Sequence, residues 1–200
     1  MVKFGGHVEA IREGDFKGTN LYLIPYNKIK KLVVEHESEK STQFIDAWQD
    51  ALSKAEDDFQ KSRQEFWGHI FSTIGPNAPA IDVRGAHPGK ALKLFVESVQ
   101  PEQSQGLLFQ LMKIKGAATT NSEGLRKLVK KFDKYQNTQF SLKLLPDLFT
   151  SSLYSGQSML QDGIDLFRQL LEDSSSSWVN VLIRNNSKTK HAQEIHLPHL

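Results

Sequence analysis

Apolar residues recur near every fourth position over much of the chain, which is the spacing of an amphipathic helix. The clearest pattern lies between residues 42 and 74, where no glycine or proline interrupts before Gly68. Its apolar members are Phe44, Trp48, Leu52, Ala55, Phe59, Phe66 and Ile70. The spacing therefore predicts one long helix over 42–74.

Shorter patterns flank this helix. They predict a helix over 3–13 and a second over 25–36, with Pro25 in its first turn, where a missing N–H costs little. A second long helical stretch is predicted over about 90–117. Pro101 lies inside this stretch and should kink or split it, because proline cannot donate the helical hydrogen bond.

The last third of the chain gives a mixed pattern. A helix is expected after Asn121 or Ser122, either of which suits an N-cap. One or two shorter helices are predicted over 145–172, and Trp178–Ile183 reads as the first strand. We therefore predict an all-α domain over 1–172, with 173–200 as a linker or the stub of a following module.

Composition limits the class of protein. Apolar residues make up 38% of the 200 positions and charged residues 24%, which is enough for a packed core. The net charge of +2 argues against a globally basic nucleic-acid binder. The absence of cysteine excludes disulfides, and no apolar run is long enough to span a membrane. The start of the chain lacks a secretory signal, so a cytoplasmic, cytosol-facing protein is expected.

Four lysines nevertheless gather on one predicted helix. Lys127, Lys130, Lys131 and Lys134 are spaced i, i+3, i+4 and i+7, so they share a face. The opposite face carries the apolar residues Leu125, Leu128, Val129 and Phe132. Like charges at this spacing repel and weaken a helix, so a one-sign face is easier to understand if it binds an anion. The alternative is a basic surface helix without a ligand.

A second basic patch is predicted early in the chain. Tyr26 and Lys30 are spaced i and i+4 on the helix over 25–36 and share a face. Lys3 lies at the foot of the first predicted helix.

Three segments together resemble the SPX domain family. The segment Lys3-Phe4-Gly5 resembles the basic-Phe-Gly opening of that family, and Tyr26–Lys31 resembles its Tyr-x-x-Leu-Lys-Lys signature. The segment Asn121–Lys134 is similar to its Asn-x-x-Gly-Phe-x-Lys-Ile-x-Lys-Lys-x-Asp-Lys signature and is the most specific of the three. The resemblance covers about residues 1–172.

The resemblance implies a fold and a function. The fold would be a bundle with two long helices and an N-terminal hairpin of short helices. The function would be non-catalytic sensing of cellular phosphate status, through binding of inositol pyrophosphates or inositol hexakisphosphate, with a fused or separate protein as effector. By motif position Tyr26, Lys30 and Lys131 would form the central cluster. Lys127, Lys130 and Lys134 would form a neighbouring lysine surface, with Lys3 contributing.

The residues themselves give little support to other functions. No nucleophile, metal or phosphate-loop motif is recognisable, so an enzyme is not predicted, and no metal or cofactor is expected. Single-stranded nucleic acid is disfavoured because no aromatic residues are interleaved with the lysines. Anionic membrane lipid and an acidic protein partner both remain open as alternatives.

Overall fold

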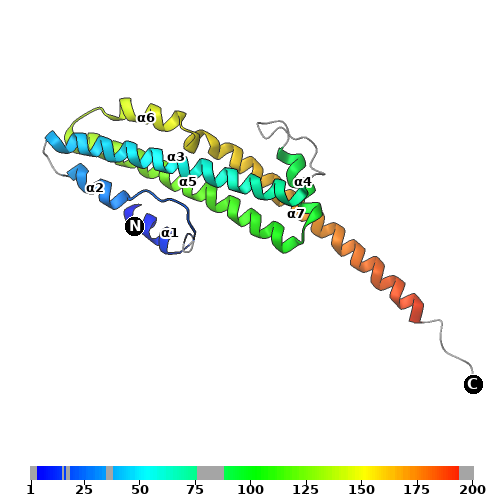
Figure 1. Cartoon of the computed structure of the whole chain (residues 1–200). Coiled ribbons are helices and arrows are strands. Elements are labelled where there is room, and N and C mark those ends of the chain that lie inside the picture. Colours follow the sequence, from blue (N-terminus) through cyan, green and yellow to red (C-terminus); the bar gives the residue numbers. More distant parts are fainter. Residues whose placement is uncertain (1–3, 15, 17–18, 35–37, 76–87, 194–200) are drawn as a thin grey trace, which may run out of the picture. The chain divides into compact units, whose positions relative to one another are not determined.

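The computed structural model describes residues 4–14, 16, 19–34, 38–75 and 88–193, and all its regular structure in these ranges is helical (Figure 1). This confirms the predicted all-α class. The helices are α1 Phe4–Glu13, α2 Tyr26–Val34, α3 Ser38–Ile74, α4 Pro88–Ser98, α5 Pro101–Gln136, α6 Ser141–Thr150 and α7 Ser152–Gln193. The predicted split at Pro101 is also confirmed, because α4 ends at Ser98 and α5 begins at the proline itself.

The chain divides into two compact units. Unit 1 holds Met1–His69 and Phe109–Asp162, and unit 2 holds Ile70–Leu108 and Gly163–Leu200. In unit 2, Phe95 of α4 meets Phe167 of α7 edge to face, with ring centroids 6.5 Å apart. All the predicted site residues that the structure describes lie in unit 1.

The core of unit 1 lies between α3 and α5, which run antiparallel. Phe44 and Phe132 stack with ring centroids 4.2 Å apart, and Trp48 Nε1 donates a 3.0 Å hydrogen bond to the Leu125 carbonyl. Every apolar residue predicted for the long helix is buried, as are those predicted behind the lysines. The apolar spacing therefore identified both buried faces correctly.

Helices α6 and α7 complete the bundle of unit 1. Gly156 of α7 lies against the Phe59 ring of α3, and Gln157 Nε2 donates to Ser122 Oγ of α5 at 2.9 Å. Glu56 accepts a 2.8 Å hydrogen bond from the Ser152 N–H, which satisfies an otherwise unpaired donor at the first turn of α7. Thus Glu56 stabilises a helix end and is not simply a solvated charge of α3.

An extended segment after α1 is held against α3 and α5 by side chains. Asn121 is 2% exposed; its Oδ1 accepts from the Ile24 N–H at 2.9 Å and its Nδ2 donates to the Tyr22 carbonyl at 2.8 Å. Asp58 accepts from the Tyr22 N–H at 2.9 Å. This segment therefore gains its backbone hydrogen bonds from two helices that lie far from it in the sequence.

The predicted N-cap at Asn121 or Ser122 is wrong, because α5 runs through both residues without a break. The Asn121 side chain instead forms hydrogen bonds with the extended segment. Gly124 lets that segment approach α5: a Cβ at this position would lie 2.6 Å from Ile24 Cδ1. From the local sequence, Asn121 and Gly124 would both be expected to interrupt a helix. In the structure both lie inside α5, where they contact a segment that is distant in the sequence.

The predicted strand is also wrong. Residues 178–183 lie inside α7, which continues to Gln193. A strand there would find no second strand to pair with in the described ranges, and an isolated strand is not stable. The division into 1–172 and 173–200 falls within this helix, so no break in secondary structure accompanies it, and the division stays a prediction.

Replacing Asn121 with alanine should destabilise the protein. The substitution removes two buried hydrogen bonds and leaves the Ile24 N–H and the Tyr22 carbonyl without partners. We expect the free energy of unfolding, measured by urea denaturation, to fall by about 2–4 kcal/mol.

The exposed Asn20 provides the matched control, and Asn20→Ala should change that free energy by less than about 0.5 kcal/mol. Equal unfolding midpoints for the two variants would contradict the role assigned to Asn121.

Candidate functional site

The lysine face of α5, defined by Lys127, Lys130, Lys131 and Lys134, is the outer face of a helix whose inner face is fully buried. Leu125, Leu128, Val129 and Phe132 on the inner face are 0% exposed. Because this packing fixes the rotation of α5, the lysines cannot turn inward. The sequence predicted this arrangement correctly.

Phe4 of α1 joins the two predicted basic patches. Its ring meets the Tyr26 ring edge to face, with centroids 4.9 Å apart, and the Lys127 ammonium lies 4.1 Å from the centre of the same ring. A cation at this distance is attracted to the face of an aromatic ring. Tyr26 and Lys127 are therefore brought together, although 100 positions separate them in the sequence.

Helix α2 runs beside the part of α5 that carries the lysines. Ile24, just before α2, packs on Gly124, and at the other end Gln136 Nε2 donates to the Val33 carbonyl at 3.2 Å. These two contacts bring Lys30 level with the lysine face along α5. The flank of α2 that carries Lys30 also carries Asn27, whose Nδ2 donates to Glu9 of α1.

The remaining lysines differ in how they are held. The Lys131 ammonium lies 5.4 Å from the centre of the Tyr135 ring, one turn along α5. Lys130 and Lys134 are exposed and form no ion pair with the described residues. Lys3, the last predicted member of the site, lies outside the described residues.

Glu123 is the acidic residue at the edge of the lysine face. It accepts hydrogen bonds from Arg126 Nε at 2.7 Å and Arg126 Nη2 at 2.8 Å, and its Oε1 lies 3.2 Å from Lys127 Nζ. The hydrogen bonds from Arg126, helped by Lys127, lower the pKa of Glu123 to about 2. Burial raises the pKa of Tyr26, and the Glu123 charge raises it further, so its phenol stays neutral and able to donate.

Three participants were not predicted as members of the site: Phe4, Glu123 and Arg126. The spacing of Glu123 to Arg126 and Lys127, at i+3 and i+4, is a recognisable signal for an ion pair on a helix. No local pattern could have found Phe4, because its contacts with Tyr26 and Lys127 exist only in the folded chain.

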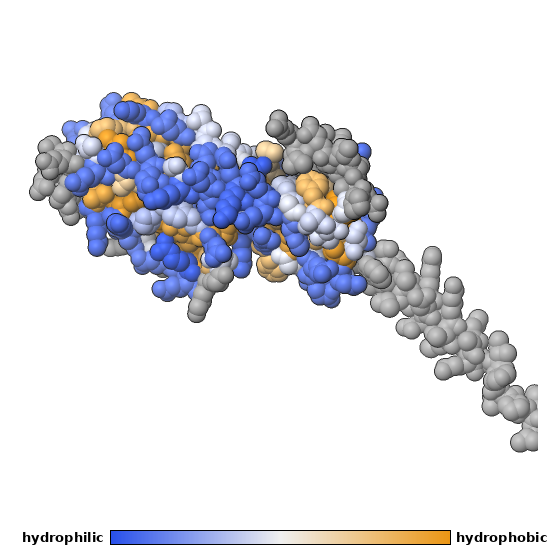
Figure 2. Space-filling view, in the orientation of Figure 1, coloured by the Kyte–Doolittle hydropathy of each residue, from blue (hydrophilic) through white to orange (hydrophobic). Residues whose placement is uncertain are grey.

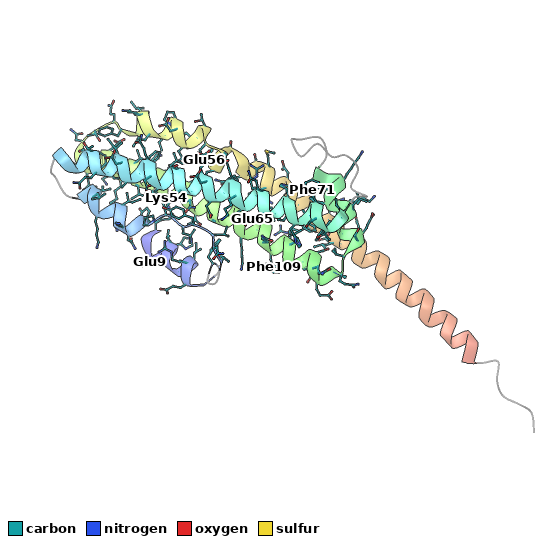
Figure 3. All side chains as sticks on the ribbon, viewed as in Figure 1. Glu9, Lys54, Glu56, Glu65, Phe71 and Phe109 are labelled. Atoms are coloured by element: carbon teal, nitrogen blue, oxygen red, sulfur yellow. The ribbon has the colours of Figure 1, made fainter. Side chains whose placement is uncertain are left out.

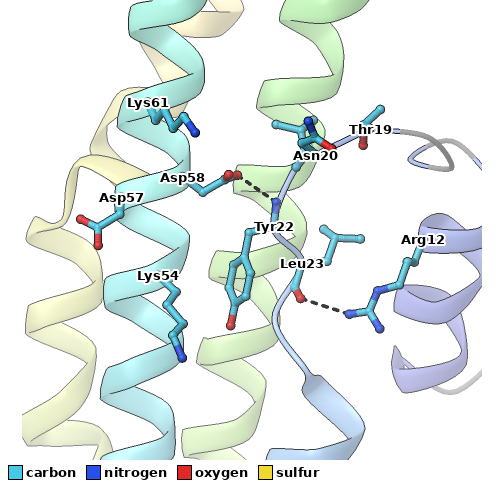
Figure 4. Close-up of a pocket in the computed structure, with 10 residues that line it drawn as sticks. Arg12, Thr19, Asn20, Tyr22, Leu23, Lys54, Asp57, Asp58 and Lys61 are labelled. Carbon is cyan, nitrogen blue, oxygen red and sulfur yellow. Dashed lines mark hydrogen bonds between the residues drawn. The ribbon is translucent and has the colours of Figure 1, made fainter.

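A groove of about 650 Å³ lies elsewhere in unit 1, between the extended segment and α3 (Figure 4). Its cations are engaged: Arg12 donates to the Leu23 carbonyl at 3.1 Å, and Lys54 pairs with Asp50 at 2.7 Å. Asp57 and Asp58 also line it, so its charge is mixed (Figure 3 shows Lys54 among the charged side chains of α3). None of the predicted site residues that the structure describes lines this groove, and it is not a basic site.

Other kinds of site find little support among the described residues. No group of three or more histidine, aspartate or glutamate side chains there could hold a metal ion. No helix of the described chain is both long and apolar enough to cross a bilayer.

Comparisons with protein-family models, with curated proteins and with solved structures found no match to this chain.

The stabilisation that the ion pairs of Glu123 provide should depend on pH. Since its pKa is lowered from 4.5 to about 2, the stabilisation from these pairs is present above about pH 4.5 and is lost as the pH falls toward 2. An NMR titration of the side-chain carboxyl should find Glu123 still ionised at about pH 3.

In Arg126→Ala the midpoint of the same carboxyl should move upward, toward 4.5, because its first hydrogen-bond donor is gone. A wild-type midpoint near 4.5 would show that the pairs do not form in solution.

Proposed function

We propose that this protein is a non-catalytic receptor for inositol pyrophosphates or related inositol polyphosphates, which reports phosphate status to a protein partner or a fused module. The observation that carries the proposal is the meeting of Tyr26 and Lys127 on Phe4, beside three further lysines of α5. The resemblance of the same segments to SPX signatures supports it.

The chemistry of the lysine face suits such a ligand. An inositol polyphosphate carries several dianionic groups around a small ring, and lysine ammoniums on flexible stems adapt to groups at different positions. Each charge-assisted hydrogen bond contributes about 1.5–3 kcal/mol, before the cost of ordering the side chains. Five or six contacts therefore permit micromolar or tighter binding, which should weaken as salt rises.

Calorimetry tests the proposal directly. We expect an inositol pyrophosphate to bind much more tightly than inorganic phosphate, because one phosphate reaches only one or two of the lysines. Equal, weak affinities for the two ligands would mean that the lysine face attracts anions without selecting among them, and this would overturn the proposal.

Lys131→Ala tests whether position on the face matters. We expect a loss of about 1–3 kcal/mol of binding free energy, which is a roughly 5- to 150-fold weaker affinity. Lys54→Ala removes the same charge from α3, outside the lysine face, and should have almost no effect. Equal losses would mean that only net charge is sensed.

Glu123 should oppose binding, because its carboxylate occupies Arg126 and Lys127 and repels an incoming phosphate. Glu123→Gln keeps the shape of the side chain and removes the charge. We expect about two- to fivefold tighter binding of the polyphosphate, consistent with an exposed ion pair worth under about 1 kcal/mol. Unchanged affinity would place the ligand away from Lys127.

A further inference from the structure

A second feature of unit 1 lies next to the lysine face, and the proposed receptor role does not use it. Large apolar side chains are exposed on α6 and at the start of α7: Leu142 is 73% exposed, Phe149 41% and Tyr154 45%. Leu142, Leu145 and Phe149 are spaced i, i+3 and i+7, so they share one flank of α6. Orange, hydrophobic atoms lie over α6 in Figure 2.

This apolar flank lies on the same side as part of the basic surface. The Phe149 and Tyr154 rings are 4.9 Å apart, which joins α6 to the first turn of α7. Helix α7 runs antiparallel to α5, with Gln157 bonded to Ser122 and Gln161 to Lys115. Tyr154, one turn before Gln157, therefore lies beside Arg126, and the two side chains are close enough to interact electrostatically.

The lysine face has two sides with different neighbours. Lys127 is the member that contacts α1, through Phe4. Arg126 lies one turn after Ser122, which bonds Gln157 of α7, and Lys130 lies one turn further on, so both are on the flank of α5 that is nearest α7. Asp133, near the same side, is engaged in the turn into α6: it accepts from the Phe140 N–H at 2.7 Å and the Ser141 N–H at 3.0 Å.

We propose that this surface, formed by Leu142, Phe149 and Tyr154 beside Arg126, Lys130 and Lys134, docks on an anionic lipid bilayer. Charge complementarity selects the occupant, because a basic row beside exposed leucine and aromatic side chains matches an interface of anionic headgroups over acyl chains. Tyrosine suits the boundary itself, since its ring is apolar and its hydroxyl is polar. The surface shares Lys130 and Lys134 with the lysine face, but its apolar side chains take no part in polyphosphate binding, so variants of those side chains test this role separately.

Co-sedimentation of the full chain with vesicles tests the proposal. We expect binding to vesicles of phosphatidylcholine with about one third phosphatidylserine, and much weaker binding to phosphatidylcholine alone. Phe149→Ser and Leu142→Ser should each lower the partition coefficient about three- to tenfold, because each removes an inserting side chain without changing the charge.

Phe109→Ser is the matched control: Phe109 is 63% exposed on α5 but lies outside this surface, so its loss should leave vesicle binding unchanged. Circular dichroism melting curves should agree among all variants, since each side chain is exposed. Calorimetry with inositol hexakisphosphate should give the same affinity for Phe149→Ser as for wild type, which separates this proposal from the receptor role.

Three results would overturn the proposal. The first is no binding to the anionic vesicles, and the second is an equal loss in Phe109→Ser and Phe149→Ser. The third is a concentration-dependent dimer in wild type that Phe149→Ser converts to monomer without lipid, because the apolar flank would then be a contact between copies of the chain.

Discussion

The docking of residues 22–24 on α5 is the constraint on which the candidate site depends. Asn121 holds this segment by two hydrogen bonds from the middle of a helix, and Gly124 removes the side chain that would keep it away. Helix α2 begins two residues after Ile24, so its position beside the lysine face follows from this contact. Without it, the Tyr26 patch and the lysines would be two unrelated basic surfaces.

The same docking also reduces the electrostatic repulsion among the four lysines that share one face of α5. Four lysines on adjacent turns repel one another, and a free helix would be weakened by this. Phe4 offers Lys127 an aromatic face, and Glu123 supplies the opposite charge to Lys127 and to Arg126. The folded structure thus relieves the repulsion at one end of the face, while Lys130 and Lys134 remain in solvent.

The features of the fold that depend on local spacing could be predicted from the sequence. Helical periodicity identified the buried faces of α3 and α5, because their apolar residues repeat regardless of which partner covers them. It failed at the N-cap predicted for Asn121 or Ser122, because α5 runs through both residues and Asn121 bonds a segment about 100 positions away. It failed again at residues 178–183, where β-branched residues favour a strand but no partner strand exists in the described ranges. The membership of the lysine face was predictable, but the bridging role of Phe4 was not.

The lysines of α5 are not equivalent, and the difference bears on what the face can bind. Lys127 and Lys131 each lie over an aromatic ring, which limits the rotamers of their long side chains. Lys130 and Lys134 are exposed and make no such contact with the part of the chain that the structure describes, so they keep more rotamer freedom. Ordering a free lysine costs more conformational entropy than engaging one that is already held. Engaging a ligand would therefore cost less conformational entropy at Lys127 and Lys131 than at Lys130 and Lys134.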